Sequence, residues 1–235
     1  MKRLPLAAFV FLAAAPVSAQ KTPVPDLLRQ AFTPPAFKQL YAYDFEDVNV
    51  GNGQKGKTIT STTRGRIDPS RKKGDRVTIT FAEDTSDKPL DLKKLDERYE
   101  RNADGGIFCD GLSEKDVTNF SDKGATPAGH VFTFTPKAKS SADGTMKDIM
   151  KKMAAEVVID PATAAIRSFN AVLTKTHNVM LVFDVKSASM KATCATTPDG
   201  RSHMARMEFR MSGSGLGQSI QVNSVQTISN IAPVG

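Results

Sequence analysis

Residues 155–169 read AEVVIDPATAAIRSF, and this segment is the clearest indication of the fold class. It indicates a strand, a turn at Asp160-Pro161 and a second strand, because the Asp-Pro pair interrupts a run of apolar and β-branched residues. The two strands are close enough in sequence to pair as a hairpin. The chain therefore contains antiparallel β-structure, and the same pattern extends in both directions from here.

Toward the C-terminus the sequence is almost unbroken strand and turn. Residues 179–185 predict one strand covered on both faces, because apolar side chains occupy both of its registers. Asp199-Gly200 predicts a turn. In the strand that follows, apolar residues alternate with charged ones, which is typical of a strand with one face in the core and one in water. The apolar set is Ala205, Met207, Phe209 and Met211.

Toward the N-terminus the period of two returns. Tyr41, Tyr43 and Phe45 share one face of a predicted strand, and Phe132 and Phe134 share a face of another. Residues 57–67 are crowded with β-branched side chains, which suit a pleated strand better than a helix.

The stretch GNGQKGKT, residues 51–58, matches the pattern of a phosphate-binding loop. Such a loop needs a helix after it, whereas a strand is predicted here. Asn52-Gly53 is instead a strong signal for a tight hairpin, because both central residues of a type I′ turn need a positive φ. We interpret this stretch as a hairpin and expect no nucleotide ligand.

Three helices are expected. One covers residues 25–32 and ends before Pro34-Pro35; a second covers 91–102, with Leu92, Leu95 and Tyr99 on one stripe. A third begins at Thr145 and carries an apolar stripe. This stripe, either a mobile lid over an apolar site or a simple cover for the end of a sheet, consists of Met146, Ile149, Met150 and Met153.

The predicted fold is α+β and mainly β: a curved antiparallel sheet, an unclosed β-barrel or half-barrel, covered by two or three short helices. Two interpretations of its apolar face remain open, an ordinary filled core and a concave surface that receives acyl chains. The candidate ligand-binding residues are Tyr41, Tyr43, Phe45, Phe132, Phe134, Leu181, Phe183, Met207, Phe209 and Met211.

The N-terminus predicts export. Lys2 and Arg3 precede an apolar run, and Val17-Ser18-Ala19 forms a small-residue cleavage site. We expect a signal peptide over residues 1–19, cleaved after Ala19, and a single β-rich periplasmic domain over 20–235. The two cysteines, Cys109 and Cys194, are expected to form a disulfide in that oxidising compartment.

The sequence contains no recognisable catalytic or metal-binding motif. Its three histidines are scattered, and its formal charge of +7 is too diffuse to indicate nucleic-acid binding. We therefore expect no catalytic residue, no cofactor, no metal and no nucleic-acid partner.

In layout the chain resembles the periplasmic lipoprotein-carrier family of Gram-negative bacteria. AEVVIDPATAAIRSF looks like the strand–turn–strand of that group, and RGRIDPSRKKGDRVTI, residues 64–79, stands where its first long hairpin would be. The order of a helix, strands, a middle helix and further strands is also similar. The resemblance implies an unclosed β-barrel with an apolar cavity for lipid-modified partners or free lipid.

Three functions follow from these observations. The leading hypothesis is a monomeric periplasmic carrier of lipid or acylated protein that makes transient contact with a membrane surface. The second is a non-catalytic interaction module of the cell envelope, whose apolar face is its core. The third is a secreted hydrolase whose site is assembled from distant residues.

Overall fold

The stretch that predicted the fold forms a hairpin. Strands β6 (Met153–Ile159) and β7 (Ile166–Leu173) pair antiparallel. The turn between them is closed by Asp160, whose carbonyl oxygen accepts a hydrogen bond from the amide of Ala164 and whose carboxylate accepts one from the amide of Ala162, both at 2.9 Å. The predicted strand–turn–strand is confirmed.

The computed structural model describes residues 25–33, 39–52, 57–86, 89–101, 103, 107–110, 113–137, 148–179, 183–215 and 217–235. The predicted signal peptide lies outside these residues. The helices are α1 (Asp26–Phe32), α2 (Leu92–Glu100) and the short 3₁₀ helix η2 (Glu114–Asp116). The remaining strands are β1 (Leu40–Asn52), β2 (Thr58–Ile67), β3 (Val77–Asp84), β4 (Val117–Thr126), β5 (Gly129–Pro136), β8 (His177–Val179), β9 (Phe183–Thr196), β10 (Ser202–Gly215) and β11 (Gln218–Val234).

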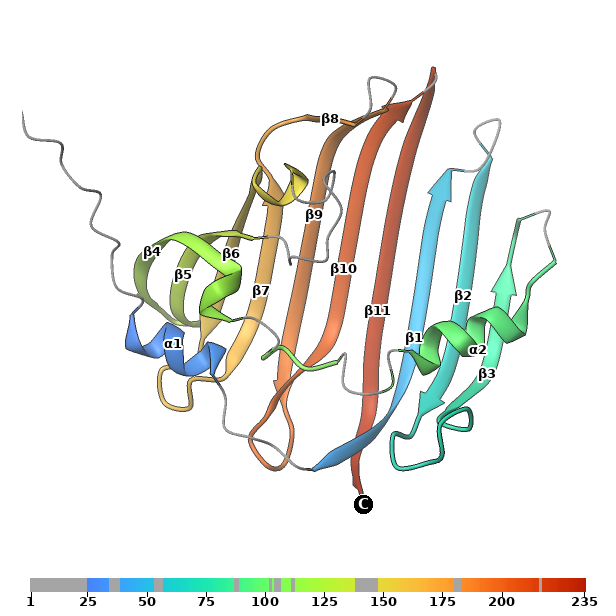
Figure 1. The fold of residues 1–235 in the computed structure, drawn as a ribbon, viewed down its shortest axis with the longest axis horizontal. Coiled ribbons are helices and arrows are strands. Elements are labelled where there is room, and N and C mark those ends of the chain that lie inside the picture. Colours follow the sequence, from blue (N-terminus) through green and yellow to red (C-terminus); the bar gives the residue numbers. More distant parts are fainter. Residues whose placement is uncertain are drawn as a thin grey trace, which may run out of the picture.

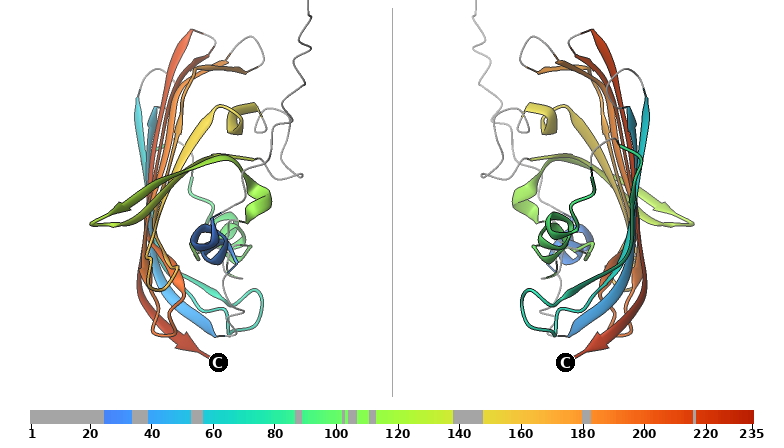
Figure 2. Two further views of the ribbon diagram at one scale, coloured as in Figure 1. Left: turned by 90° about the vertical axis from the view of Figure 1, so that its left-hand side faces the viewer. Right: turned by 90° about the vertical axis from the view of Figure 1, so that its right-hand side faces the viewer.

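Eleven described strands form one antiparallel sheet. Its order is β3-β2-β1-β11-β10-β9-β7-β6-β5-β4, with β8 attached to β9. The sheet bends into an unclosed half-barrel, and α1 and α2 lie on its concave side (Figures 1 and 2). The predicted fold class is therefore confirmed.

Bulges accompany this curvature. The pairing of β9 with β10 shifts register between Met204 and Arg206 and again between Ser212 and Gly213. A bulge inserts one extra residue into a strand, which bends the strand and increases its twist. These shifts lie in the middle of the sheet, where the half-barrel curves between its two ends.

Each helix covers one wing of the sheet, and each wing has its own hydrophobic cluster. Phe32 of α1 meets Phe134 edge-to-face with ring centroids 6.1 Å apart, in a cluster built on β4 to β7. Tyr99 of α2 lies on Phe45, with ring centroids 4.3 Å apart, in a cluster built on β1 to β3, β10 and β11. Cys109 contacts both clusters.

The predicted disulfide is confirmed. Cys109 bonds Cys194 of β9 across a sequence separation of 85 residues. It fixes residues 107–110 to the concave side of the sheet, where the amide of Met204 also donates to the carbonyl of Ile107. This loop connects the two wings.

Two sequence predictions are wrong in detail. Residues 179–185 are not one strand, because Val179 pairs with Phe183, so the chain reverses direction between β8 and β9. The third helix ends earlier than expected: its last helical residue is Met150, and Met153 is the first residue of β6. Alternation along the sequence does not reveal a reversal in which both arms are apolar.

The stretch GNGQKGKT is followed by a strand, as predicted. β1 and β2 pair antiparallel as far as Asn52 and Thr58. The residues between Asn52 and Lys57, where the turn itself was predicted, lie outside the described part of the chain. The helix that a phosphate-binding loop would require is replaced by β2.

Candidate functional site

The two faces of the sheet differ sharply in chemistry. On the convex face charged side chains form ion pairs: Arg64 with Glu46 at 2.6 Å, Arg66 with Asp44 at 2.7 Å, and Arg206 with Glu208 at 3.0 Å. The hydrogen bond from Arg206 holds the pKa of Glu208 below its usual range. The convex face is therefore polar and suited to contact with solvent.

The concave face is apolar and filled on both wings. Half of the predicted ligand-binding residues lie there, each no more than 3% exposed: Tyr41, Tyr43, Phe45, Phe132 and Phe134. Four of them belong to the clusters under α1 and α2, and Tyr41 lies against Phe108 with ring centroids 6.4 Å apart. In this structure these five side chains are part of the filled core.

The centre of the concave face is different. Phe183, Met207, Phe209 and Met211 of β9 and β10 are only half-buried, and Met207 borders the cluster under α2. Phe209 pairs with Met190 of β9, which shares its face. We call Met190, Met207, Phe209 and Met211 the apolar strip. The remaining candidate, Leu181, lies outside the described residues.

Polar side chains continue the same face on the next strands. Residues that pair directly across neighbouring strands lie on the same face of a sheet. From Met207 of β10, this row of paired residues runs to Gln226 of β11, Asp47 of β1 and Thr63 of β2. One step further along the strands, Phe209 leads in the same way to a second polar row. This polar strip consists of Gln226, Asp47, Thr63, Ser224, Asn49 and Ser61.

Asp47 is the unusual member of the polar strip. It is 7% exposed, and its Oδ2 accepts a 2.6 Å hydrogen bond from the hydroxyl of Tyr99. Its Oδ1 is buried without a hydrogen-bond partner among the described residues. Burial, followed by the bond to Asp47, raises the pKa of Tyr99, and burial, followed by the charge of Asp47, raises the pKa of Tyr43.

Sequence analysis missed Asp47, although a signal for it was present. Tyr43, Phe45 and Asp47 are spaced by two on one strand, so a carboxylate occupies the register of two aromatic core residues. An acid on the buried face of a strand is uncommon unless it is paired.

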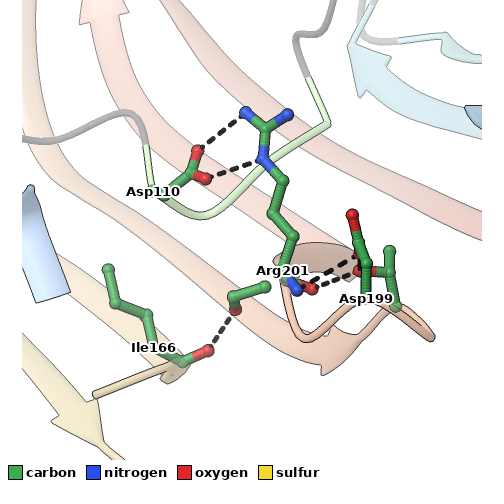
Figure 3. Close-up of polar contacts among 6 residues, drawn as sticks. Asp110, Ile166, Asp199 and Arg201 are labelled. Atoms are coloured by element: carbon green, nitrogen blue, oxygen red, sulfur yellow. Dashed lines mark hydrogen bonds and ion pairs between the residues drawn. The ribbon is translucent and has the colours of Figure 1, made fainter. Parts of the chain in front are cut away.

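A pocket lies between α1 and the turns β6–β7 and β9–β10, and we call it the foot pocket. Its lining includes residues 163–166 and 199–202. It has a volume of about 470 Å³. Arg201 lines this pocket, and Figure 3 shows its two hydrogen bonds to Asp110, at 2.8 and 3.3 Å. The same guanidinium lies 3.3 Å from the centroid of the Phe108 ring.

The polar groups of the foot pocket are bonded to one another. Asp199 accepts a hydrogen bond from the hydroxyl of Thr197. Burial favours its neutral form, but the effects of Thr197 and the nearby Tyr41 hydroxyl outweigh burial and hold the pKa of Asp199 below its usual value. Ser202 donates to the carbonyl of Ile166 (Figure 3). The contacts tie the turn β9–β10 to the loop held by the disulfide, so the foot pocket belongs to the framework of the fold.

The predicted lid is seen only in part. Ile149 and Met150 are half-buried in the helical turn 148–150, which lies on the same side of the sheet as α1 and α2 (Figure 2). Met153 joins the α1 cluster from β6, and Met146 lies outside the described residues. Lys152, which follows the turn, has its Nζ 2.8 Å from Nδ1 of His177.

The three histidines lie in three separate places. His130 is 2.6 Å from Asp122, His177 contacts Lys152, and the ring of His203 donates to the carbonyl of Met204 at 3.3 Å. No group of three metal-binding side chains comes together within the described residues. None of the described helices combines the length and the apolar character needed to span a membrane.

No protein-family model matches the chain, and no curated protein matches it significantly. Solved structures do show similarity. A LolA superfamily protein from Nitrosomonas europaea is 9% identical with a TM-score of 0.34, over 88% of this chain and 92% of that one. A domain assigned as an outer membrane lipoprotein-sorting protein from Vibrio parahaemolyticus is 8% identical with a TM-score of 0.33, over 83% and 85%.

The chain is also similar to part of lipovitellin, in a structure that concerns lipid–protein interactions. The identity is 10%, the TM-score is 0.34, and the alignment covers 84% of this chain but only 26% of lipovitellin. The family that the sequence resembles is thus among those of the similar solved structures. At such low identities, function has to be inferred from the geometry of the chain itself.

Proposed function

We propose that the chain is a periplasmic binding or carrier protein for lipid or lipid-modified protein, and that it binds without catalysis. The observation that carries the proposal is the apolar strip: Met190, Met207, Phe209 and Met211 are half-buried on the concave face while the opposite face of the same strands is charged. If the concave face served only as a core, we would expect the apolar side chains at its centre to be fully buried.

The strip suits acyl chains. Each CH₂ group removed from water contributes about 0.8 kcal/mol, so a single acyl chain supplies ample binding free energy. Three of the four side chains are methionines, which are unbranched and polarisable and adapt to chains of different shape. The wings keep the half-barrel rigid while the strip supplies the contact surface.

An exported carrier has to exchange its ligand with a membrane or with an acylated protein. We therefore propose transient contact with a membrane surface as part of the same function. The charged convex face makes the concave side the one that meets the apolar ligand.

The test is binding of monolauroylglycerol to the mature protein, measured by native mass spectrometry and titration calorimetry after organic extraction of any bound lipid. Phe209→Gln removes an aromatic contact from the strip, and we expect at least about tenfold weaker binding. Val225→Gln is the matched control, because Val225 pairs with Glu208 and lies on the convex face of the neighbouring strand. It should bind within about twofold of the wild type.

Two results would overturn the proposal. Wild-type protein that binds neither monolauroylglycerol nor a lauroylated peptide is not a lipid carrier, and the envelope interaction module would take its place. Equal binding by the Phe209→Gln and Val225→Gln variants would remove the strip from the site. Circular dichroism of both variants verifies that the fold is retained.

A further inference from the structure

In two rows of the concave face, apolar side chains on β9 and β10 give way to polar ones on the next strands, whereas the row of Met211 stays apolar at Val222 and Ile59. The apolar strip lies on β9 and β10, and the polar strip lies on β11, β1 and β2. Neighbouring strands are about 4.8 Å apart, so Asp47 lies about 10 Å from Met207, two strands away in the same row. An amphiphile has the same two-part character over a similar length.

Asp47 is an unsatisfied acceptor in this arrangement. Tyr99 occupies Oδ2, and Oδ1 has no partner among the described residues. A buried acceptor without a donor costs free energy, so such a group needs an explanation. A ligand that brings a donor to the carboxylate would remove this cost.

Tyr99 is the side chain that a ligand head would replace. It is the one buried residue of α2, whose first residue, Leu92, is 54% exposed. The helix is also held by Leu95, which packs against the same cluster, and at its end, where Glu100 accepts a hydrogen bond from the amide of Gly74 at 2.9 Å. If the Tyr99 side chain moves away from Asp47, a ligand head can therefore reach the carboxylate while the end of α2 stays attached.

The charges around Asp47 set the kind of head that fits. Asp84, on the same face through its pairing with Ser61, adds a second carboxylate, and Arg98 lies over the ring of Tyr99 at 5.9 Å. An anionic head placed at Asp47 would be repelled by its carboxylate, whereas a hydroxyl or an ammonium group would donate a hydrogen bond to it.

We propose that Asp47 is the head-group site of the concave face, and that it selects amphiphiles whose head donates hydrogen bonds, through a hydroxyl or an ammonium group, over amphiphiles with an anionic head. This inference rests on the proposed function, because the acyl chain of the same ligand lies on the apolar strip.

The test compares three probes with the same chain length and different heads: monolauroylglycerol, laurylamine and laurate. Calorimetry on the full mature protein should give affinities for the first two at least about tenfold higher than for laurate, which corresponds to one charge-assisted hydrogen bond. The hydroxyl and ammonium probes also separate neutral heads from cationic ones.

Asp47→Asn keeps the shape of the side chain and removes its charge. It should narrow the preference over laurate to about threefold or less, since the amide both accepts and donates. Asp44→Asn is the matched control: Asp44 pairs with Arg66 on the convex face, so the same change in net charge there should leave the preference intact.

Tyr99→Phe provides a second variant in case Asp47→Asn does not fold. It removes the hydroxyl that competes for Asp47, so monolauroylglycerol should bind several-fold more tightly while laurate is unchanged. Suppose that wild-type protein binds laurate as tightly as monolauroylglycerol, and that Phe209→Gln weakens the binding of both. This result would overturn the head-group site but support the proposed carrier function. Absence of binding by all three probes would overturn both.

Discussion

At the scale of single residues, His203 makes stability depend on pH. It is 6% exposed, and burial, opposed in part by its hydrogen bond to Met204, lowers the pKa of its ring. As pH falls below the ordinary histidine pKa, the unfolded chain takes up a proton that the folded chain does not. The free energy of unfolding should therefore fall with pH, from about 6.5 down to the folded-state pKa, by at most about 1.4 kcal/mol per pH unit.

The check is urea unfolding at several pH values for the wild type and for His203→Gln. The variant lacks the titrating ring, so its stability should vary less between neutral and mildly acidic pH, whatever its absolute stability. Identical slopes in the two proteins would mean that His203 does not contribute.

Single residues also show where the sequence was informative. Tyr43 and Phe45 were placed on one buried face because their period of two is local, and the structure agrees. In a regular strand Phe81 would share a face with Ile79, but a register shift between Arg64 and Gly65 turns it outward under the guanidinium of Arg64. A bulge depends on the partner strand, which the sequence of one strand does not specify.

At the scale of elements, the disulfide is the feature whose contribution is easiest to isolate. Cys109 lies in a loop that also makes backbone hydrogen bonds to Ser202 and Met204 of β10, and Cys194 lies in β9, 85 residues further on. The chain-entropy model assigns about 4 kcal/mol to a crosslink that closes so long a loop. We expect the Cys109→Ala/Cys194→Ala double variant to lose most of this in urea unfolding.

Reduction provides the internal control. Dithiothreitol should lower the stability of the wild type to that of the double variant and leave the double variant unchanged. A loss below about 1 kcal/mol on reduction would show that the loop is held without the crosslink.

Elements were predicted well where the pattern was long and local. The hairpin β6–β7 and helix α2 follow from turn residues and periodicity within one stretch, and the pairing of Cys109 with Cys194 follows from there being two cysteines. The candidate site was predicted less well. Met207, Phe209 and Met211 are only half-buried, whereas Phe132 and Phe134 are fully buried. This difference depends on which part of the sheet each helix covers, which is decided by contacts between segments far apart in sequence.

At the scale of the whole molecule, the packed, rigid parts of the half-barrel are separate from the less buried surface that we propose binds the ligand. The wings are filled by α1 and α2, and the long strands β9, β10 and β11 join the wings through continuous antiparallel pairing. A half-barrel built in this way holds its curvature without a closed ring of strands. The side chains of the apolar strip stay only half-buried because the described helices α1 and α2 lie over the wings and not over the strip.

This arrangement predicts how backbone protection is distributed. The central strand β10 is paired on both sides, with β9 and with β11, whereas the edge strand β4 pairs with β5 alone and loses register between Thr118 and Ser121 and between Asp122 and Gly124. Amide hydrogen exchange, followed by mass spectrometry under native conditions, should therefore be at least about tenfold slower in β10 than in β4, because edge amides open locally while central ones need global unfolding. Equal protection of the two strands would mean that the sheet opens only as one unit, and that its centre is not the rigid base on which the proposed ligand lies.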